Sequence, residues 1–124
     1  DDTNLKVQLL DVIPMAIGLE RADGNVHTVF PRNSPIPNAK QIIGTTSLPN
    51  QTELIMRIWQ GDHELAKRNE QLGEFCFSGI RAAPAGQVKV EITFDVNIEG
   101  ILTMTARDPE TGKQLKSTVR VTQS

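Results

Sequence analysis

The 124-residue sequence is poor in the features that mark several common classes of protein. Cys76 is its one cysteine, so no disulfide can form within the chain and an oxidising compartment is not indicated. Aromatic residues make up 4%, and 13 basic side chains nearly balance 15 acidic ones. A nucleic-acid surface needs a basic face and stacking rings, so this composition argues against one. No apolar run approaches the roughly 18 residues of a membrane span, and no signal peptide opens the sequence.

Metal and phosphate sites are not predicted either. His27, His63 and Cys76 have none of the close spacings of zinc ligands. Asp62 and Glu64 flank His63, but a solvated charged loop is a better interpretation of this cluster than acid/base catalysis. The sequence has no glycine loop that would cradle a phosphate, so any ATP binding belongs to a domain outside this chain. We therefore expect no catalytic residue and no metal site in this chain.

Alternation of apolar and polar residues, the pattern of a strand with one buried face, recurs along most of the sequence. It is clearest in VKVEITFDV, where Val88, Val90, Ile92, Phe94 and Val96 alternate with polar residues. The segments MAIGLE, NVHTVF, AKQIIGTTS, ELIMRIW, LGEFCFSG, ILTMTAR and QLKSTVRV show similar patterns. Together they predict eight strands.

Turn-forming residues separate these segments. ADGN and PETGK place Gly24 and Gly112 where a positive φ closes a tight hairpin, and NIEG ends similarly at Gly100. RNSPIPN and IRAAPAGQ indicate longer loops, and HELAKRNEQL is compatible with a turn of helix or an irregular loop. Eight short strands joined by antiparallel-type turns predict an all-β fold, an eight-stranded antiparallel β-sandwich.

Several phrases of the sequence resemble a known family when they are taken in order and at their spacing. They are LLDVIPMAIGLE, FPRNSPIP, IMRIWQGDHELAKRNEQLGEF, GIRAAPAG, VEITFDVNIEGIL and TGK. The family is the seventy-kilodalton heat-shock chaperones, and the match is to the β-sandwich half of their substrate-binding domain, over roughly residues 7 to 122. The resemblance implies a molecular chaperone that binds extended hydrophobic segments of unfolded polypeptides. The family's ATPase domain and helical lid have no counterpart in this sequence.

In that family an extended peptide crosses the sandwich, and one of its side chains enters an apolar pocket. Backbone hydrogen bonds tolerate any peptide sequence, while the pocket selects a leucine-like side chain. The residues alone leave a second interpretation open, in which alternating Leu, Met and Val are simply core. The resemblance implies a peptide-binding set of Ile17, Leu19, Ala22, Ile43, Ser47, Leu54, Met56 and Val90, with Ala22 and Ser47 arching over the peptide.

The sequence departs from the family pattern around this site. Where members usually have a Phe before a pair of Thr, this chain has Ile43 and Gly44, and we expect Ile43 to replace the Phe. Two positions that contact the lid through charges in bacterial members fall on Pro49 and Ala85. Because neither residue can form an ion pair, any lid latch is expected to be different or weaker.

An arm with two leucines precedes the first predicted strand. Pro14 has no amide to give to a ladder, so we predict an interdomain linker arm over residues 1–13 and a peptide-binding sandwich over residues 14–124. The alternative is a disordered terminus that carries leucines by accident. The resemblance implies that the arm docks on the ATPase domain when ATP is bound and is released after hydrolysis. The implied interdomain residues are Leu9, Leu10, Asp11, Arg32, Asn33 and Glu99.

The resemblance also implies the partners of the whole protein. Because the sequence opens on Asp1, we expect it to be a piece of a longer chain that binds ATP in another domain. The expected partners are unfolded polypeptides, the protein's own ATPase domain, a J-domain co-chaperone and a nucleotide exchange factor, but neither nucleic acid nor membrane. The expected location is the cytoplasm, with an organelle lumen or matrix as the alternative. Two other functions stay open: a divergent scaffold or exchange-factor relative with a degenerate pocket, and an unrelated ligand-binding β-sandwich.

Overall fold

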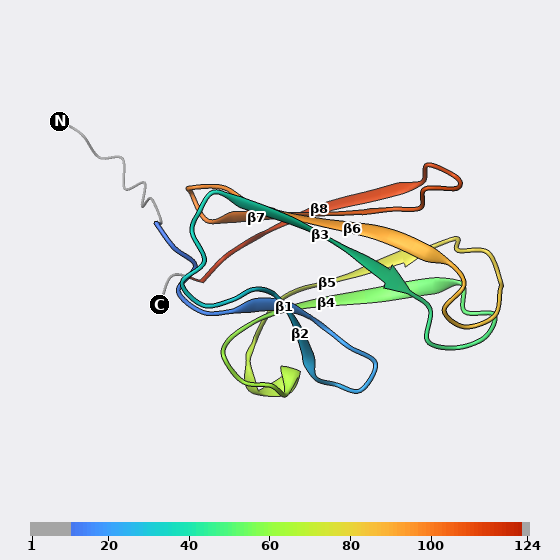
Figure 1. Ribbon diagram of the computed structural model, residues 1–124, viewed down its shortest axis with the longest axis horizontal. Helices are drawn as coiled ribbons and strands as arrows, with labels where there is room; N and C mark the ends of the chain where they lie inside the picture. The colour runs from blue at the N-terminus through green and yellow to red at the C-terminus, as the bar shows by residue number, and fades with distance from the viewer. Residues whose placement is uncertain (1–10, 123–124) are drawn as a thin grey trace.

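Two four-stranded antiparallel sheets face each other in the computed structural model, which describes residues 11–122 (Figure 1). One sheet has the strand order β2-β1-β4-β5 and the other the order β3-β6-β7-β8. This arrangement of eight strands in the described part of the chain confirms the predicted all-β sandwich. The strands are β1 Ile17–Glu20, β2 Val26–Phe30, β3 Asn38–Thr45, β4 Glu53–Gln60, β5 Glu70–Ser78, β6 Lys89–Val96, β7 Ile101–Arg107 and β8 Gln114–Arg120.

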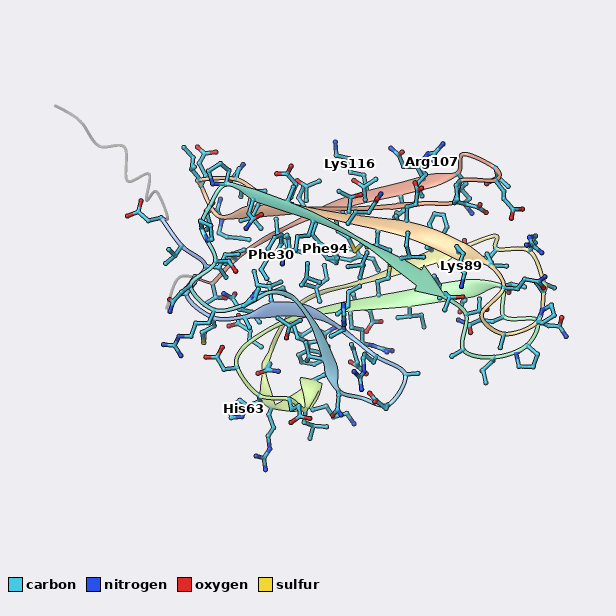
Figure 2. All side chains as sticks on the ribbon, viewed as in Figure 1. Phe30, His63, Lys89, Phe94, Arg107 and Lys116 are labelled. Atoms are coloured by element: carbon cyan, nitrogen blue, oxygen red, sulfur yellow. The ribbon has the colours of Figure 1, made fainter. Side chains whose placement is uncertain are left out.

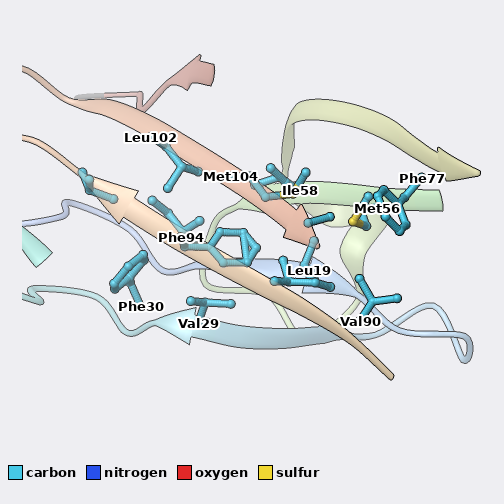
Figure 3. Close-up of a cluster of buried hydrophobic side chains, with 14 of the residues drawn as sticks. Leu19, Val29, Phe30, Met56, Ile58, Phe77, Val90, Phe94, Leu102 and Met104 are labelled. Atoms are coloured by element: carbon cyan, nitrogen blue, oxygen red, sulfur yellow. The ribbon is translucent and has the colours of Figure 1, made fainter. Parts of the chain in front are cut away.

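The core lies between the two sheets, where the alternating apolar residues meet. In β6, Val90, Ile92, Phe94 and Val96 are buried, while the residues between them face outward. Figure 2 shows Phe94 between the sheets and Arg107 pointing away from the molecule. The close-up in Figure 3 shows buried side chains that both sheets contribute to one cluster. Each sheet therefore buries one face, which explains the alternation of apolar and polar residues in the sequence.

The first strand is shorter than the sequence predicts. It begins at Ile17, because the amide of Ala16 donates to the carboxylate of Asp62 (3.2 Å) rather than to a neighbouring strand. Ile13 lies ahead of it and is fully buried in the core, and its amide donates to the carbonyl of Ser34 (2.9 Å). The boundary at residue 13 stays a prediction, but Ile13 itself packs with the sandwich.

Turns and loops follow their sequence signals closely. Gly24 and Gly112 have φ angles of 87° and 77°, as expected for tight hairpins. The run HELAKRNEQL forms a single 3-10 turn, Ala66–Arg68, and then enters β5 at Glu70. The two ends of the described chain lie together at one end of the sandwich, and the β3–β4 loop lies at the other (Figure 1).

Candidate functional site

A groove of about 890 Å³ opens at the end of the sandwich that carries the β3–β4 loop. The β1–β2 hairpin, the second half of β3, the β3–β4 loop and the start of β4 form its sides. Its floor is aliphatic, with Leu19 and Ile92 buried and Leu54 half-buried. The volume is within the range of about 300–1,000 Å³ that is usual for ligand sites.

Exposed apolar side chains gather on the lip of this groove. Ile43, Leu48 and Ile55 line it and are 57%, 64% and 46% exposed. They are three of the six large hydrophobic side chains that residues 11–122 leave exposed. Clustered apolar exposure of this kind is costly in water and is typical of a surface that binds another apolar surface.

Strand register determines which side chains of β3 enter the groove. Ile42 pairs with Ile92 and Gly44 pairs with Val90, so Ile42 and Gly44 face inward toward the other sheet. Ile43 pairs with Glu91 and faces outward. β3 is also an edge strand of its sheet, so an extended chain can add beside it through backbone hydrogen bonds.

The predicted peptide-binding residues divide into two groups in the structure. The first group lines the groove, on its floor, its lip and its two loops. The second group is buried in the core beneath it and does not line the groove. The first group is Leu19, Ala22, Ile43, Ser47 and Leu54, and the second is Ile17, Met56 and Val90. The side chain of Ile43 is on the lip, and Gly44 holds the inward-facing position beside it.

The β3–β4 loop is held in place by a side chain that the sequence did not single out. Gln51 accepts hydrogen bonds from the amides of Ser47 (3.0 Å) and Leu48 (3.2 Å) through its Oε1 atom. Its Nε2 atom donates to the carbonyl of Glu53 (2.6 Å). This side of the groove is therefore organised before any ligand arrives. Gln51 has no local sequence signal, because its partners depend on the path of the loop.

The β1–β2 hairpin on the opposite side is held by Arg21 and Asp23. Their side chains form an ion pair at 2.6 Å, and the amide of Asn25 donates to Asp23 Oδ1 at 2.9 Å. The hydrogen bond from Arg21, followed by the one from the backbone of Asn25, lowers the pKa of Asp23. The spacing of Asp23 and Asn25 is a turn signal of the Asx type, so this feature was readable from the sequence.

Charged groups around the groove are balanced and paired. Two acidic residues, Glu20 and Glu53, and two basic ones, Arg21 and Arg57, line it, so their formal charges cancel. Arg57 pairs with Glu74 at 2.8 Å, and Trp59 Nε1 donates to Glu20 at 2.9 Å. The groove therefore offers no strong field of either sign to a charged ligand.

Cys76 lies on the outer face of β5, beside Glu53. Its Sγ atom donates to the Glu53 carboxylate at 3.3 Å. This hydrogen bond to a carboxylate, together with partial desolvation and the carboxylate's charge, raises the pKa of the Cys76 thiol. A raised pKa keeps the thiol protonated and lowers its reactivity, so the residue does not have the character of a nucleophile.

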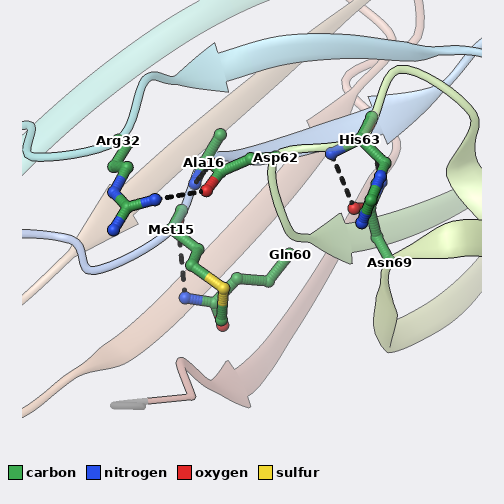
Figure 4. A network of polar contacts seen from close by, with 7 residues as sticks. All are labelled: Met15, Ala16, Arg32, Gln60, Asp62, His63 and Asn69. Atoms are coloured by element: carbon green, nitrogen blue, oxygen red, sulfur yellow. Dashed lines mark hydrogen bonds and ion pairs between the residues drawn. The ribbon is translucent and has the colours of Figure 1, made fainter.

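The segments that carry the described interdomain residues, which are the start of the described chain, the β2–β3 loop and the β6–β7 turn, lie at the opposite end of the sandwich (Figure 1). Arg32 pairs with Asp62 at 2.8 Å, as Figure 4 shows, and Asn33 follows in the same loop with a φ of 68°. Glu99 lies in the β6–β7 turn, and the carbonyl of Asp11 accepts from the amide of Ile36 (3.1 Å). Leu9 and Leu10 lie outside the described residues.

Neither a candidate metal site nor a membrane-spanning helix is present in the described part of the chain. Residues 11–122 contain no cluster of three or more His, Cys, Asp or Glu side chains that could hold a metal ion. Over the same range there is no helix with the length and apolar character needed to cross a membrane.

Comparisons with known proteins agree on one family. A model of the family described as Hsp70 protein matches residues 2–124. The chain is 42% identical over 113 residues to the chaperone protein dnaK of Cyanidioschyzon merolae, covering 91% of this chain and 19% of that protein. It is 41% identical over 116 residues to the chaperone protein DnaK of Mesomycoplasma hyopneumoniae (94% and 19%). It is also 40% identical over 112 residues to the mitochondrial heat shock 70 kDa protein of Pisum sativum (90% and 17%). The chain thus spans about a fifth of the length of these relatives.

Proposed function

The chain belongs to the Hsp70 family of chaperones, and we propose that it is the module that binds extended hydrophobic segments of unfolded polypeptides. The observation that carries the proposal is the groove with an aliphatic floor and a lip of exposed Ile43, Leu48 and Ile55. A folded protein gains nothing from leaving these side chains in water, whereas an apolar segment that covers them removes that cost.

An extended segment suits this groove for two physical reasons. The free edge of β3 offers backbone hydrogen bonds that any sequence can make, so binding is tolerant of sequence. The floor around Leu19, Leu54 and Ile92 favours an apolar side chain at the centre of the segment. Burial of one leucine-sized side chain is worth about 1.5–3 kcal/mol. Micromolar affinity corresponds to about −8 kcal/mol, so flanking backbone and lip contacts must supply the rest.

We also propose that, in a longer protein, the other end of the sandwich contacts an ATPase domain. Residues 1–13 would act as the linker arm, and Asp11, Arg32, Asn33 and Glu99 would meet that domain. ATP would be bound and hydrolysed there, with a J-domain co-chaperone and an exchange factor as partners. The expected compartment remains the cytoplasm, although one relative is named as mitochondrial. In the longer protein, Arg32→Glu should weaken the stimulation of ATP turnover by peptide, and the fragment's peptide affinity should not change.

The peptide-binding proposal is tested with two labelled heptapeptides that differ only at the central residue, Leu or Asp. Fluorescence anisotropy should give a micromolar Kd, about −8 kcal/mol, for the leucine peptide and much weaker binding for the aspartate peptide. Leu48→Asp on the groove lip should weaken the leucine peptide about tenfold or more, since it replaces an apolar contact with a charge that must be desolvated. Ile98→Asp is the matched control, because Ile98 is similarly exposed at the opposite end of the sandwich.

A second candidate function is a scaffold or exchange-factor relative whose pocket is degenerate. The observation in its favour is Gly44, which leaves the inward-facing position of β3 without a side chain where the family usually has a Phe nearby. Equal affinity for the Leu and Asp peptides, or a Leu48→Asp variant that binds as well as the unmodified chain, would favour this candidate over peptide binding.

A further inference from the structure

One wall of the groove contains a glycine, Gly44, on the inward-facing side of β3. Gly44 lies near the end of β3, pairs with the fully buried Val90 and lines the groove from the inward-facing side. A glycine inside a strand weakens the strand, and it often marks a place where a ligand approaches the backbone closely. The position of Gly44 in the groove matches that second role.

The space beside Gly44 is limited by one movable group. A Cβ atom built on Gly44 would lie 2.9 Å from Cδ1 of Ile92, and the next nearest atoms, Ile92 Cγ1 and the carbonyl oxygen of Val90, are 3.8 Å away. The δ-methyl of Ile92 therefore lies across the bare glycine. Because it is the far end of a flexible side chain, it can turn aside for a guest. The wall at this point consists of a flat peptide unit and one adjustable methyl group.

No Phe, Tyr or Trp is among the described residues that line the groove, and the one aromatic ring in this lining is the imidazole of His27. The large apolar residues that line it beside Ile92 include Leu19, Ile42 and Leu54, and all of them are aliphatic. A flat ring can lie against a glycine and its peptide units, which is how aromatic neighbours cover glycines in β-sheets. Aromatic side chains also bury about 150–250 Å² each, and they have few rotatable bonds to immobilise.

We propose that Gly44 makes the groove selective for segments with a central aromatic side chain, in preference to a central leucine. This inference rests on the proposed peptide binding and specifies its substrate class. The preference follows from the missing side chain: once the δ-methyl of Ile92 turns aside, a ring can lie flat against the peptide units at Gly44, whereas a branched leucine covers less of them.

The test uses labelled heptapeptides that differ only at the central residue: Leu, Phe, Trp or Asp. The Phe and Trp peptides should bind the unmodified chain at least about fivefold more tightly than the Leu peptide, which requires only about 40 Å² of additional apolar burial. Gly44→Val should remove this preference by filling the space beside the backbone of Gly44, so that the Phe and Trp peptides no longer bind more tightly than the Leu peptide. Gln41→Val is the matched control, because Gln41 is on the outward face of the same strand and does not line the groove.

Each outcome decides a different question. Equal binding of the Leu and Phe peptides by the unmodified chain overturns the inference about Gly44 but leaves peptide binding intact. A Gly44→Val variant that folds, as judged by its urea midpoint, and keeps the aromatic preference also overturns it. Should Gly44→Val fail to fold, Gly44→Ala adds one methyl at the same place and is measured with the same peptides. Absence of binding by all the apolar peptides would instead overturn the proposed function itself.

Discussion

Val90→Phe separates a core residue from a pocket residue. The resemblance to the family implies that Val90 belongs to the peptide pocket, but its side chain is 0% exposed between the two sheets and does not line the groove. Adding the larger ring to a packed core forces neighbouring side chains and backbone to shift, which typically costs about 1–3 kcal/mol. With a urea dependence of about 1–3 kcal/mol per M, the unfolding midpoint should fall by roughly 1 M.

Peptide affinity is measured on the same sample as the urea midpoint. The structure predicts a clear loss of stability and a small change in the affinity for a leucine-centred heptapeptide, because the ring does not enter the groove. The opposite pair of results, an unchanged midpoint with lost affinity, would show that the space beside Val90 is open to a guest side chain. The assignment of the groove floor would then be wrong.

Three further predictions concern other described residues. The buried side chain of Gln60 accepts a hydrogen bond from the amide of Thr122 (2.7 Å) and donates one to its carbonyl (3.0 Å). Gln60→Ala removes both and should lower the free energy of unfolding by about 3 kcal/mol. A loss below about 1 kcal/mol in urea unfolding would contradict this. Glu53→Gln removes the carboxylate that raises the pKa of the Cys76 thiol, so that pKa should fall. Alkylation of Cys76 by iodoacetamide at mildly alkaline pH should then become faster, and an unchanged rate would refute the role of that carboxylate. Gly112→Ala should cost about 1 kcal/mol although nothing lies within 4 Å, because its φ of 77° strains any residue with a Cβ; an unchanged midpoint would contradict this.

The fold could be predicted from the sequence because its signals are local. The alternation in β6 needs only one buried face, and the hairpin at Gly24 needs only one residue with a positive φ. Ile13 was missed as a core residue, because its burial depends on a contact with Ser34, which lies beyond the whole first hairpin. Propensity and periodicity carry no information about such long-range contacts.

The candidate site could be predicted only in part, for a related reason. Ile17 and Leu19 have the same alternation and face the same way, but only Leu19 reaches the groove, because the depth of each residue depends on the opposite sheet. Register decides between Ile43 and Gly44: their pairing with Glu91 and Val90 puts the glycine, and not the isoleucine, on the inner face. A sequence compared residue by residue with a family gives the neighbourhood of the site but not the direction of each side chain.

The central claim is that an apolar segment binds in the groove between the β1–β2 hairpin and β3. A titration of the isotopically labelled chain with an apolar heptapeptide, followed by two-dimensional NMR of backbone amides, tests it directly. We expect the largest shifts at Leu19, Gly44 and Leu54, with little change at Ile98 at the opposite end. Shifts centred on the Ile98 end, or no shifts at saturating peptide, would contradict it.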